Sequence, residues 1–514
     1  MSLHFPDDFE ALPPNSVIEG DKMLVDCEDA ADYVVVGSGA AGATTALTLS
    51  LAGFSVIMIE EGPWVRTREF GKDVFPAIKA MFRNCSSNIL IGKRSSIPVL
   101  QGKCVGGSTT MSSVICSRPS PKVIDRWESE FGIGDVITYQ KLEPYFDIIE
   151  KELNATRSSD STLGNHNDLL AQAAIKMGYH AEKIPRLING CEGATSCFTG
   201  CRHGKKNSMN LSNVPRFLHQ GGKLYTCTKA SRILFQDGRA VGIKAVFVGP
   251  SQKLLFARAR RGVIVAASAI QTPLLLKASG IKQKALGRHF QIHPATGLIA
   301  KFKSSVRMGF GATQGVHILN FMESDHFKLE GLSLPPENLA FGLPFIGKSL
   351  IDHLLDYDHL TNAGVVVKAE AEGVVSTIFG SGIVRYSPTP YDMLCLRKGL
   401  KTLSEALFSV GALEIYPNVH GMPTLKSPDD LKLWDAMSTD PSHYYMGTSH
   451  LFGSTRMGRN PLTSVVDLDF RVHGLKGIYV VDSSVFPTNL GINPQLTIMA
   501  VAKIASSKIA NSNP

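Results

Sequence analysis

A glycine-rich stretch near the N-terminus, residues 32–42, constrains the fold of this chain more than any other feature. The β-branched run at 34–36 predicts a strand, glycines follow at 37, 39 and 42 with the spacing G-x-G-x-x-G, and residues 43–51 are mostly helix formers. The first glycine permits a tight turn, the second lets a pyrophosphate approach the backbone, and the third lets helix and strand pack closely. The helix N-terminus then offers free N–H groups to phosphates.

An acidic residue supports a nucleotide-binding role for this unit. The apolar run 55–59 predicts the next strand, and Glu60 follows it, about 20 residues beyond the turn, where a ribose hydroxyl needs a partner. An isolated match to the motif is usually an ordinary glycine turn, but the flanking strand, helix and acid favour a dinucleotide. An acid here also favours FAD or NAD over NADP. The predicted ligand contacts are Gly37, Gly39, Ala40, Ala41, Gly42 and Glu60.

Composition limits the class of protein. With 514 residues, 44% hydrophobic and 19% charged, the chain is globular and has room for more than one domain. The 53 basic and 45 acidic residues give a net charge of +8, but they are scattered, so no nucleic-acid partner is expected and attraction to an anionic surface stays open. The nine cysteines, an odd number, argue against a disulfide framework.

Targeting signals are not evident. The N-terminus has neither a basic start nor an apolar core, so we expect no secretory signal and a cytoplasmic location. No transmembrane segment is expected either, because the longest apolar stretch is already explained as helix, turn and strand. Peripheral membrane contact remains possible.

Further along the chain, a second glycine turn at 102–110 suits the approach of backbone amides to a flat ring or a phosphate. Residues 223–248 predict a hairpin with its turn at Gln236 to Arg239, and 269–279 predict a helix after a buried strand. Residues 156–167 are polar and predict a surface connection. From 300 to 430 the nucleotide-type pattern lapses, which indicates a separate, partly antiparallel substrate domain.

The last segment carries a second strong signal. A strand ending at Asp482, a turn containing Asn493 and Pro494, and a C-terminal helix would place Asn493 just ahead of a helix N-terminus. That is where developing negative charge on a ligand is best stabilised.

Together these pieces make the sequence similar to the glucose–methanol–choline (GMC) oxidoreductases. Five motifs occur in the family's order, at 37–60, 102–110, 266–281, 450–458 and 482–497. The resemblance implies an α/β fold, with a Rossmann-like FAD-binding domain (30–120, 205–300 and 440–514) and a discontinuous substrate domain on a mostly antiparallel sheet (121–204 and 301–439). Residues 1–29 would form an N-terminal arm.

The resemblance also implies the chemistry. FAD would accept a hydride from an alcohol carbon, His450 would take the hydroxyl proton as base, and Asn493 would position the oxygen; His443 is the competing base. The flavin contacts would add Gly102, Gly106, Gly107, Ser108, Ser112, Ala267, Asp482, Asn493 and Pro494. Two positions depart from the family pattern. Ser112 replaces its usual Asn, which puts a contact at the reactive flavin edge in doubt, and Ser268 replaces a glycine, which we interpret as a packing change.

Substrate and partners stay broader. Residues 118–127 and Cys191, Cys197 and Cys201 look most like the long-chain alcohol oxidase and dehydrogenase branch, so a hydrophobic alcohol is expected. A similar cysteine spacing occurs in sugar dehydrogenases of the family that carry an iron–sulfur cluster, although buried packing thiols are the simpler interpretation. A sugar, polyol or sterol dehydrogenase, a lyase with non-redox FAD and a binding protein on a retired enzyme fold remain alternatives. The electron acceptor, whether oxygen, a quinone or a redox protein, is open.

Overall fold

The computed structural model describes residues 12–71 and 73–512, and its largest sheet is built around the strand that precedes the glycine turn. β2 (Cys27–Val36) pairs in parallel with β3 (Val56–Ile59) on one side and β12 (Leu254–Val265) on the other. β9 (Lys223–Thr226) and β1 (Val17–Glu19) continue the parallel order beyond β3. This sheet confirms the Rossmann-like architecture.

The sheet forks at β12, the longest of its strands. The first half of β12 pairs antiparallel with β11 (Arg239–Phe247), and β10 (Thr228–Gln236) completes the predicted hairpin. The last three residues of β12 pair in parallel with β22 (Ile478–Val480). A segment from near the C-terminus therefore completes the parallel part of the sheet.

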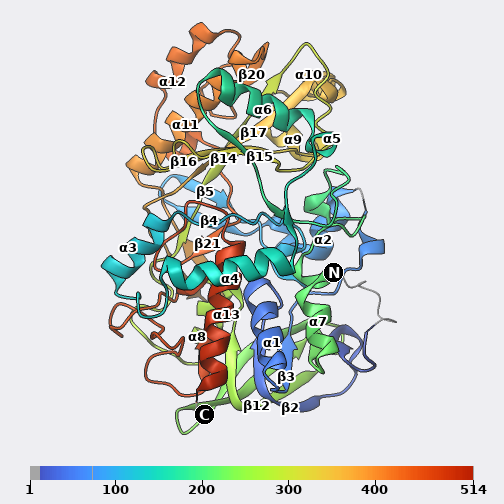
Figure 1. The fold of residues 1–514 in the computed structure, drawn as a ribbon, viewed down its shortest axis with the longest axis vertical. Helices are drawn as coiled ribbons and strands as arrows, with labels where there is room; N and C mark the ends of the chain where they lie inside the picture. Colours follow the sequence, from blue (N-terminus) through green and yellow to red (C-terminus); the bar gives the residue numbers. More distant parts are fainter. Residues whose placement is uncertain (1–11, 72, 513–514) are drawn as a thin grey trace.

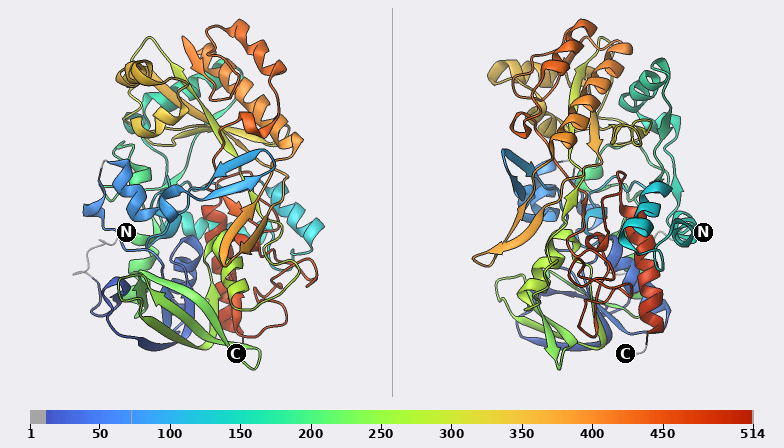
Figure 2. Two further views of the ribbon diagram at one scale, coloured as in Figure 1. Left: turned by 180° about the vertical axis from the view of Figure 1, so that it is seen from behind. Right: turned by 90° about the vertical axis from the view of Figure 1, so that its left-hand side faces the viewer.

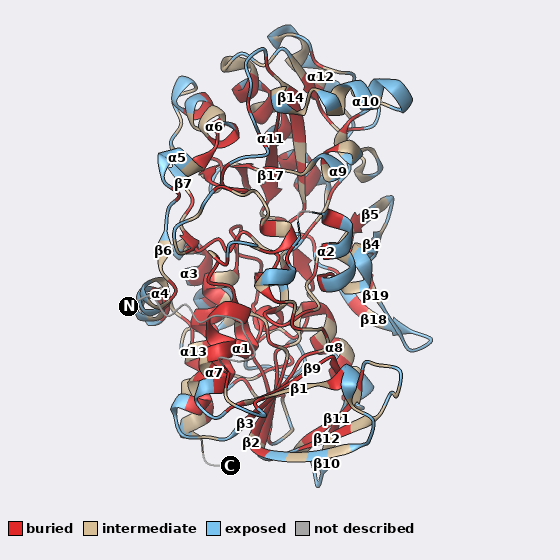
Figure 3. Cartoon of the chain, turned by 90° about the vertical axis from the view of Figure 1, so that its right-hand side faces the viewer, coloured by how far each residue is buried: buried red, intermediate tan, exposed pale blue. Residues whose placement is uncertain are grey.

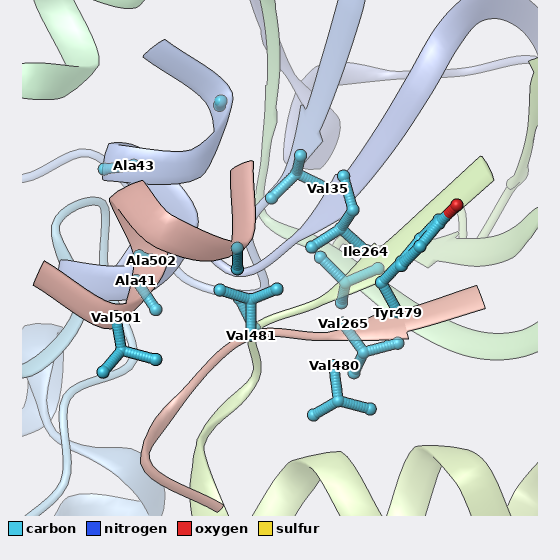
Figure 4. Close-up of a cluster of buried hydrophobic side chains, with 14 of the residues drawn as sticks. Val35, Ala41, Ala43, Ile264, Val265, Tyr479, Val480, Val481, Val501 and Ala502 are labelled. Atoms are coloured by element: carbon cyan, nitrogen blue, oxygen red, sulfur yellow. The ribbon is translucent and has the colours of Figure 1, made fainter. Parts of the chain in front are cut away.

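Helices from both ends of the chain cover one face of this sheet. α1 (Ala40–Leu51) follows the glycine turn and lies beside α13 (Gln495–Asn511), as the blue and red helices of Figure 1 show. Small residues in α1 let the two helices approach closely. Figure 4 shows the result, a core in which Val35, Ile264 and Val480 from three strands lie near Ala41 and Ala502 from the two helices.

A second sheet forms the other end of the molecule and holds its own hydrophobic core. Every pairing in it is antiparallel, which confirms the expected second sheet. α6 (Asn165–Lys176) and α11 (Pro390–Ser409) pack against it. Its strands, in spatial order, are β20 (Glu414–Tyr416), β14 (Ala295–Lys301), β17 (Leu360–Val367), β16 (Phe327–Gly331), β15 (Val316–Ile318) and β7 (Ala181–Lys183).

A small four-stranded sheet lies between the two ends, and its β18–β19 hairpin projects from the body in Figure 2, right. Figure 3 colours much of this hairpin and of helix α10 as exposed. The small sheet contains β18 (Val374–Ile378), β19 (Ser381–Arg385), β4 (Ile89–Gly92) and β5 (Ser95–Pro98).

The remaining elements are α2 (Val74–Met81), α3 (Pro121–Phe131), α4 (Tyr139–Glu152), α5 (Asp160–Leu163), α7 (Asn213–His219), α8 (Ser268–Ala278), α9 (Pro336–Leu339), α10 (Gly347–Leu355), α12 (Leu433–Ala436), β6 (Ala155–Thr156), β8 (Arg186–Leu187), β13 (Gln291–Ile292) and β21 (Leu451–Phe452).

Two expectations from the sequence differ from the structure. The polar stretch 156–167 is not a surface connection throughout, because His166 and Asn167 are fully buried at the start of α6. The Asn167 side chain accepts from the N–H groups of Gly315 and Val316, so its polarity serves an internal bond. Of the expected arm, residues 1–11 lie outside the described residues, whereas 17–19 form the edge strand β1.

The sequence predicts no transmembrane segment. Within 12–71 and 73–512, no helix combines the length and apolar character needed to cross a bilayer. The domain boundaries given above stay a prediction.

Candidate active site

A cavity of about 1750 Å³ lies where the carboxyl ends of the parallel strands face the antiparallel sheet. It exceeds the ~300–1,000 Å³ that suits a drug-sized ligand, so it can hold a dinucleotide together with a substrate. Most of the predicted site residues line it: Gly37, Gly39, Ala40, Ala41, Glu60, Gly102, Gly107, Ser108, Ser112, Ala267, His450, Asp482, Asn493 and Pro494. Gly42 and Gly106 stand behind this wall.

The first glycine turn has the shape that a dinucleotide requires. Gly37 has a φ of 103°, and a Cβ there would lie 2.4 Å from the carbonyl oxygen of Ala266. A Cβ on Gly42 would lie 1.9 Å from the carbonyl oxygen of Gly37, so helix and strand touch there. At Gly39 the nearest protein atom would be 4.0 Å away. The open space at Gly39 is where the motif places the pyrophosphate, so the residues present fit such a cofactor.

Glu60 anchors this turn as well as facing the cavity. Its Oε2 accepts from the Ser38 N–H at 3.1 Å and from the Ser38 hydroxyl at 2.6 Å, and its Oε1 accepts from the Gly62 N–H at 3.0 Å. Burial raises the pKa of Glu60, and these hydrogen bonds oppose the rise. Ser38 was not predicted, although a hydroxyl residue between two motif glycines was the available signal.

The second glycine turn packs directly on the first. Gly106 and Gly107 have positive φ values, and a Cβ on Gly107 would lie 2.9 Å from the Cα of Gly39. The Gly106 N–H donates to the Ser38 hydroxyl at 3.0 Å, so Ser38 links both turns. The Ser112 hydroxyl donates to the Thr109 carbonyl at 3.2 Å and accepts from the backbone instead of pointing freely into the cavity.

Asp482 holds the start of α8 in place. Its Oδ2 accepts from the Ser268 N–H at 2.9 Å and from the Thr272 hydroxyl at 2.6 Å, and its Oδ1 accepts from the Ser484 N–H. Ser268 has a φ of 86°, in the left-handed region that favours glycine. The family's glycine at this position therefore has a backbone reason, and the substitution is more than the packing change expected from the sequence.

His450 lies at the cavity wall beside a second histidine that the sequence did not single out. Nδ1 of His450 is 3.0 Å from Nδ1 of His293, and the Gly491 N–H donates to Nε2 of His293 at 2.9 Å. Burial, and then the charge of Lys328, lower the pKa of His450 to about 3, and burial likewise puts the pKa of His293 well below 6.5. Both rings are thus neutral near pH 7.

The contacts allow two arrangements of the ring hydrogens, because only one of the two facing Nδ1 atoms can donate. If Nε2 of His293 accepts from the Gly491 N–H, the hydrogen of His293 lies on Nδ1 and His450 carries its own on Nε2, toward the cavity. If Nδ1 of His450 donates instead, His293 carries its hydrogen on Nε2, and the Gly491 N–H has Oδ1 of Asn489 as its acceptor at 3.3 Å.

Asn493 faces His450 from the segment before α13. Its Nδ2 is 3.4 Å from Nε2 of His450, and its Oδ1 accepts from the Lys328 ammonium at 2.6 Å. Lys328, in β16, also bonds Glu330, whose other oxygen accepts from Gln314 at 3.0 Å. Neither Lys328 nor Glu330 was predicted, because only the fold brings β16 to Asn493.

The three clustered cysteines are free thiols, and two of them accept from the Arg186 guanidinium. The Arg186 guanidinium donates to Cys197 at 3.3 Å and to Cys191 at 3.8 Å, and the Lys205 N–H donates to Cys201. Although burial opposes ionisation, Arg186 and Lys206 lower the pKa of Cys197. Within the described part of the chain, no group of three or more His, Cys, Asp or Glu side chains is placed to hold a metal ion.

Comparison with known proteins gives the family. The GMC oxidoreductase models match residues 31–295 and 382–502. An uncharacterised GMC-type oxidoreductase of Mycobacterium tuberculosis is 33% identical over 92% of this chain and 74% of its own length. A long-chain-alcohol oxidase of Arabidopsis thaliana is 26% identical over 96% of this chain and 68% of its own length.

Solved structures agree on the fold. Aspergillus oryzae formate oxidase matches with a TM-score of 0.71 at 17% identity, over 94% of this chain and 99% of its own. Pyridoxine 4-oxidase matches with a TM-score of 0.70 at 16% identity, over 95% and 100%. With the glycine turns, the acid at Glu60 and the cavity between two sheets, these matches show that the chain belongs to the GMC oxidoreductase family and is an FAD-dependent oxidoreductase.

Proposed function

We propose that this protein oxidises the CH–OH group of a hydrophobic alcohol to a carbonyl. The observation that carries the proposal is the approach of Nδ2 of Asn493 to Nε2 of His450, 3.4 Å apart on the wall of the cavity that the glycine turns also line. Two nitrogens at this spacing can hold one substrate oxygen between them. When bound, FAD supplies the hydride acceptor.

In this proposal His450 takes the hydroxyl proton, as the resemblance implies. The role requires a lone pair on Nε2, so the ring hydrogen must lie on Nδ1 and face His293. His293 would then carry its hydrogen on Nε2, and the Gly491 N–H would donate to Oδ1 of Asn489 in place of Nε2. Asn493, a neutral amide, steadies the oxygen without competing for the proton.

The substrate class is supported by the lining and by the relatives. Leu332, Leu334, Phe341 and Val366 line the cavity on the side of the antiparallel sheet. Apolar walls favour an alkyl or aryl alcohol over a sugar, whose hydroxyls need polar partners. Long-chain-alcohol oxidases are among the similar sequences, whereas formate and pyridoxine oxidases share the fold at under 20% identity.

The proposal leaves the electron acceptor as oxygen, a quinone or a redox protein, and retains a cytoplasmic location with peripheral membrane contact as an option. Neither a sugar dehydrogenase with an iron–sulfur cluster nor a lyase is favoured by a particular contact in the site.

The test is an anaerobic absorbance titration of the purified protein with fatty, aromatic, sterol and sugar alcohols. Bleaching of the flavin band by fatty or aromatic alcohols supports the proposal, and admitting air then separates an oxidase from a dehydrogenase. A flavin band that no alcohol bleaches would refute it. Bleaching by sugars alone would refute the substrate class, and an iron assay on the same sample would reveal any cluster.

A further inference from the structure

A fully buried ammonium, that of Lys328, contacts Asn493, one of the two residues proposed to hold the substrate oxygen. Lys328, the second residue of β16, is 0% exposed and does not line the cavity. Burying a charge is unfavourable unless it is paired and hydrogen-bonded, so a lysine in this place has well-defined partners. Those partners are Glu330, two residues on along the same strand face, and Asn493.

The contact with Asn493 fixes the direction of its amide. An ammonium has three donors and no lone pair, so only the oxygen of an amide can face it. The 2.6 Å contact therefore puts Oδ1 toward Lys328 and turns Nδ2 toward His450 and the cavity. Without that partner, both orientations of the amide would be available, and one of them would present an acceptor to the substrate oxygen.

The other end of the pair is tied down too. Glu330 is 4% exposed and holds Lys328 with one oxygen, while Gln314 donates to the other oxygen at 3.0 Å. Lys328 belongs to the antiparallel sheet, and Asn493 belongs to the segment that leads into α13. The contact thus joins the two ends of the molecule at the cavity.

We propose that Lys328 is a positioning residue that orients Asn493, so that its N–H group and not its carbonyl faces the substrate oxygen. The proposal rests on the function proposed above for the same site. It assigns Lys328 no contact with the substrate, and its whole effect on the reaction passes through Asn493.

A double-mutant cycle tests this dependence. Lys328→Met alone leaves a buried carboxylate unpaired and can fail to fold, so the main variant is Lys328→Met/Glu330→Gln, which removes both charges. It is compared with Asn493→Ala and with the combination of all three changes. Lys206→Met, another buried lysine whose ammonium bonds the carbonyls of Thr110 and Ser112, is the matched control.

The readout is the limiting rate of anaerobic flavin reduction by the best alcohol. We expect Lys328→Met/Glu330→Gln to lower it at least tenfold, with little further loss when Asn493→Ala is added. Lys328→Arg, which keeps a donor and a charge, should retain more of the wild-type rate than Lys328→Met/Glu330→Gln does. The control Lys206→Met should cause a loss of rate that multiplies with the loss caused by Asn493→Ala. The same multiplicative behaviour in Lys328→Met/Glu330→Gln would overturn the proposal, and so would an unchanged rate.

Thermal unfolding of the same variants keeps the two proposals separable. If no alcohol reduces the wild-type flavin, the proposed function fails, while the midpoints still report the contact. Midpoint shifts that are non-additive between Lys328 and Asn493 would then show that the two side chains interact, independently of the reaction. Additive shifts would overturn the contact on which the positioning role depends, and the role with it.

Discussion

At the scale of single residues, His450 and His443 provide a matched pair. His450 lines the cavity beside Asn493, whereas His443 ends a short turn near His420 and does not reach the cavity. General-base catalysis typically contributes ~10²–10⁴-fold. We therefore expect His450→Gln to slow flavin reduction at least about 100-fold with FAD still bound, and His443→Gln to leave the rate near wild type. Stopped-flow reduction of both variants checks this, and equal losses would contradict the assignment.

Ser268 allows a second test, of backbone conformation. A side chain in the left-handed region costs about 1–2 kcal/mol, which glycine avoids. The Ser268 hydroxyl also accepts from Gln101 at 2.5 Å and donates to Gln271 at 2.7 Å. Ser268→Ala should therefore lower the unfolding free energy by about 1 kcal/mol through the lost bonds. Ser268→Gly loses the same bonds but relieves the backbone, so its thermal midpoint should be the higher of the two. The reverse order would contradict the argument.

At the scale of elements, the strand–turn–helix unit predicts different roles for two of its glycines. Gly42→Ala forces a Cβ against the Gly37 carbonyl, a backbone group that cannot move aside, so we expect a loss of about 3 kcal/mol or more in unfolding free energy. A Cβ in Gly39→Ala would meet only the Cα of Gly107, 4.0 Å away and without a clash, and the residue has an ordinary φ of −69°. The substitution should leave the apoprotein as stable as wild type and weaken FAD binding at least tenfold, about 1.4 kcal/mol.

Calorimetric titration of FAD into the apoprotein and thermal unfolding without FAD check this pair. If Gly39→Ala bound FAD as wild type does, the space at Gly39 would not be the pyrophosphate site.

The elements that could be predicted are those whose signals are local. The glycine turn with its flanking strand and helix, the hairpin and the C-terminal helix each carry their pattern within a short stretch of chain. His450 and Asn493 came from motif resemblance. Lys328 could not be found in this way, because it lies in a buried strand 165 residues from Asn493, and only the packing of the antiparallel sheet against the segment before α13 brings them together.

Ser38 and His293 show the same limit. Each owes its importance to a partner far along the chain, Gly106 for Ser38 and His450 for His293. Sequence patterns report which face of an element is apolar, but they do not report which polar side chain meets which.

At the scale of the whole molecule, buried neutral histidines predict acid sensitivity. Burial lowers the pKa of His166 to about 4 and that of His317 to about 3, from about 6.5 in the unfolded chain. Above pH 6.5 both states are neutral at these sites, so stability is unaffected. Below it the unfolded chain gains protons that the folded chain does not, so stability falls as the pH drops from about 6.5 toward 3 to 4.

At pH 5 this difference amounts to about 2 kcal/mol for each of the two histidines. The thermal midpoint should therefore fall clearly between pH 7 and pH 5, and it should fall less in His317→Phe than in wild type. Midpoints measured by circular dichroism at both pH values check this, and identical falls in the two proteins would contradict it.

The forked strand β12 has a consequence for how the protein is made. Its parallel neighbours are β2 and β22, and about 210 residues separate the end of β12 from β22 along the chain. At ~5–20 residues per second, a ribosome needs roughly 10–40 s to make them. During that time the newly made chain carries an apolar parallel sheet whose final strand has not been translated. We expect the nascent protein to need a chaperone that shields this edge until β22 emerges.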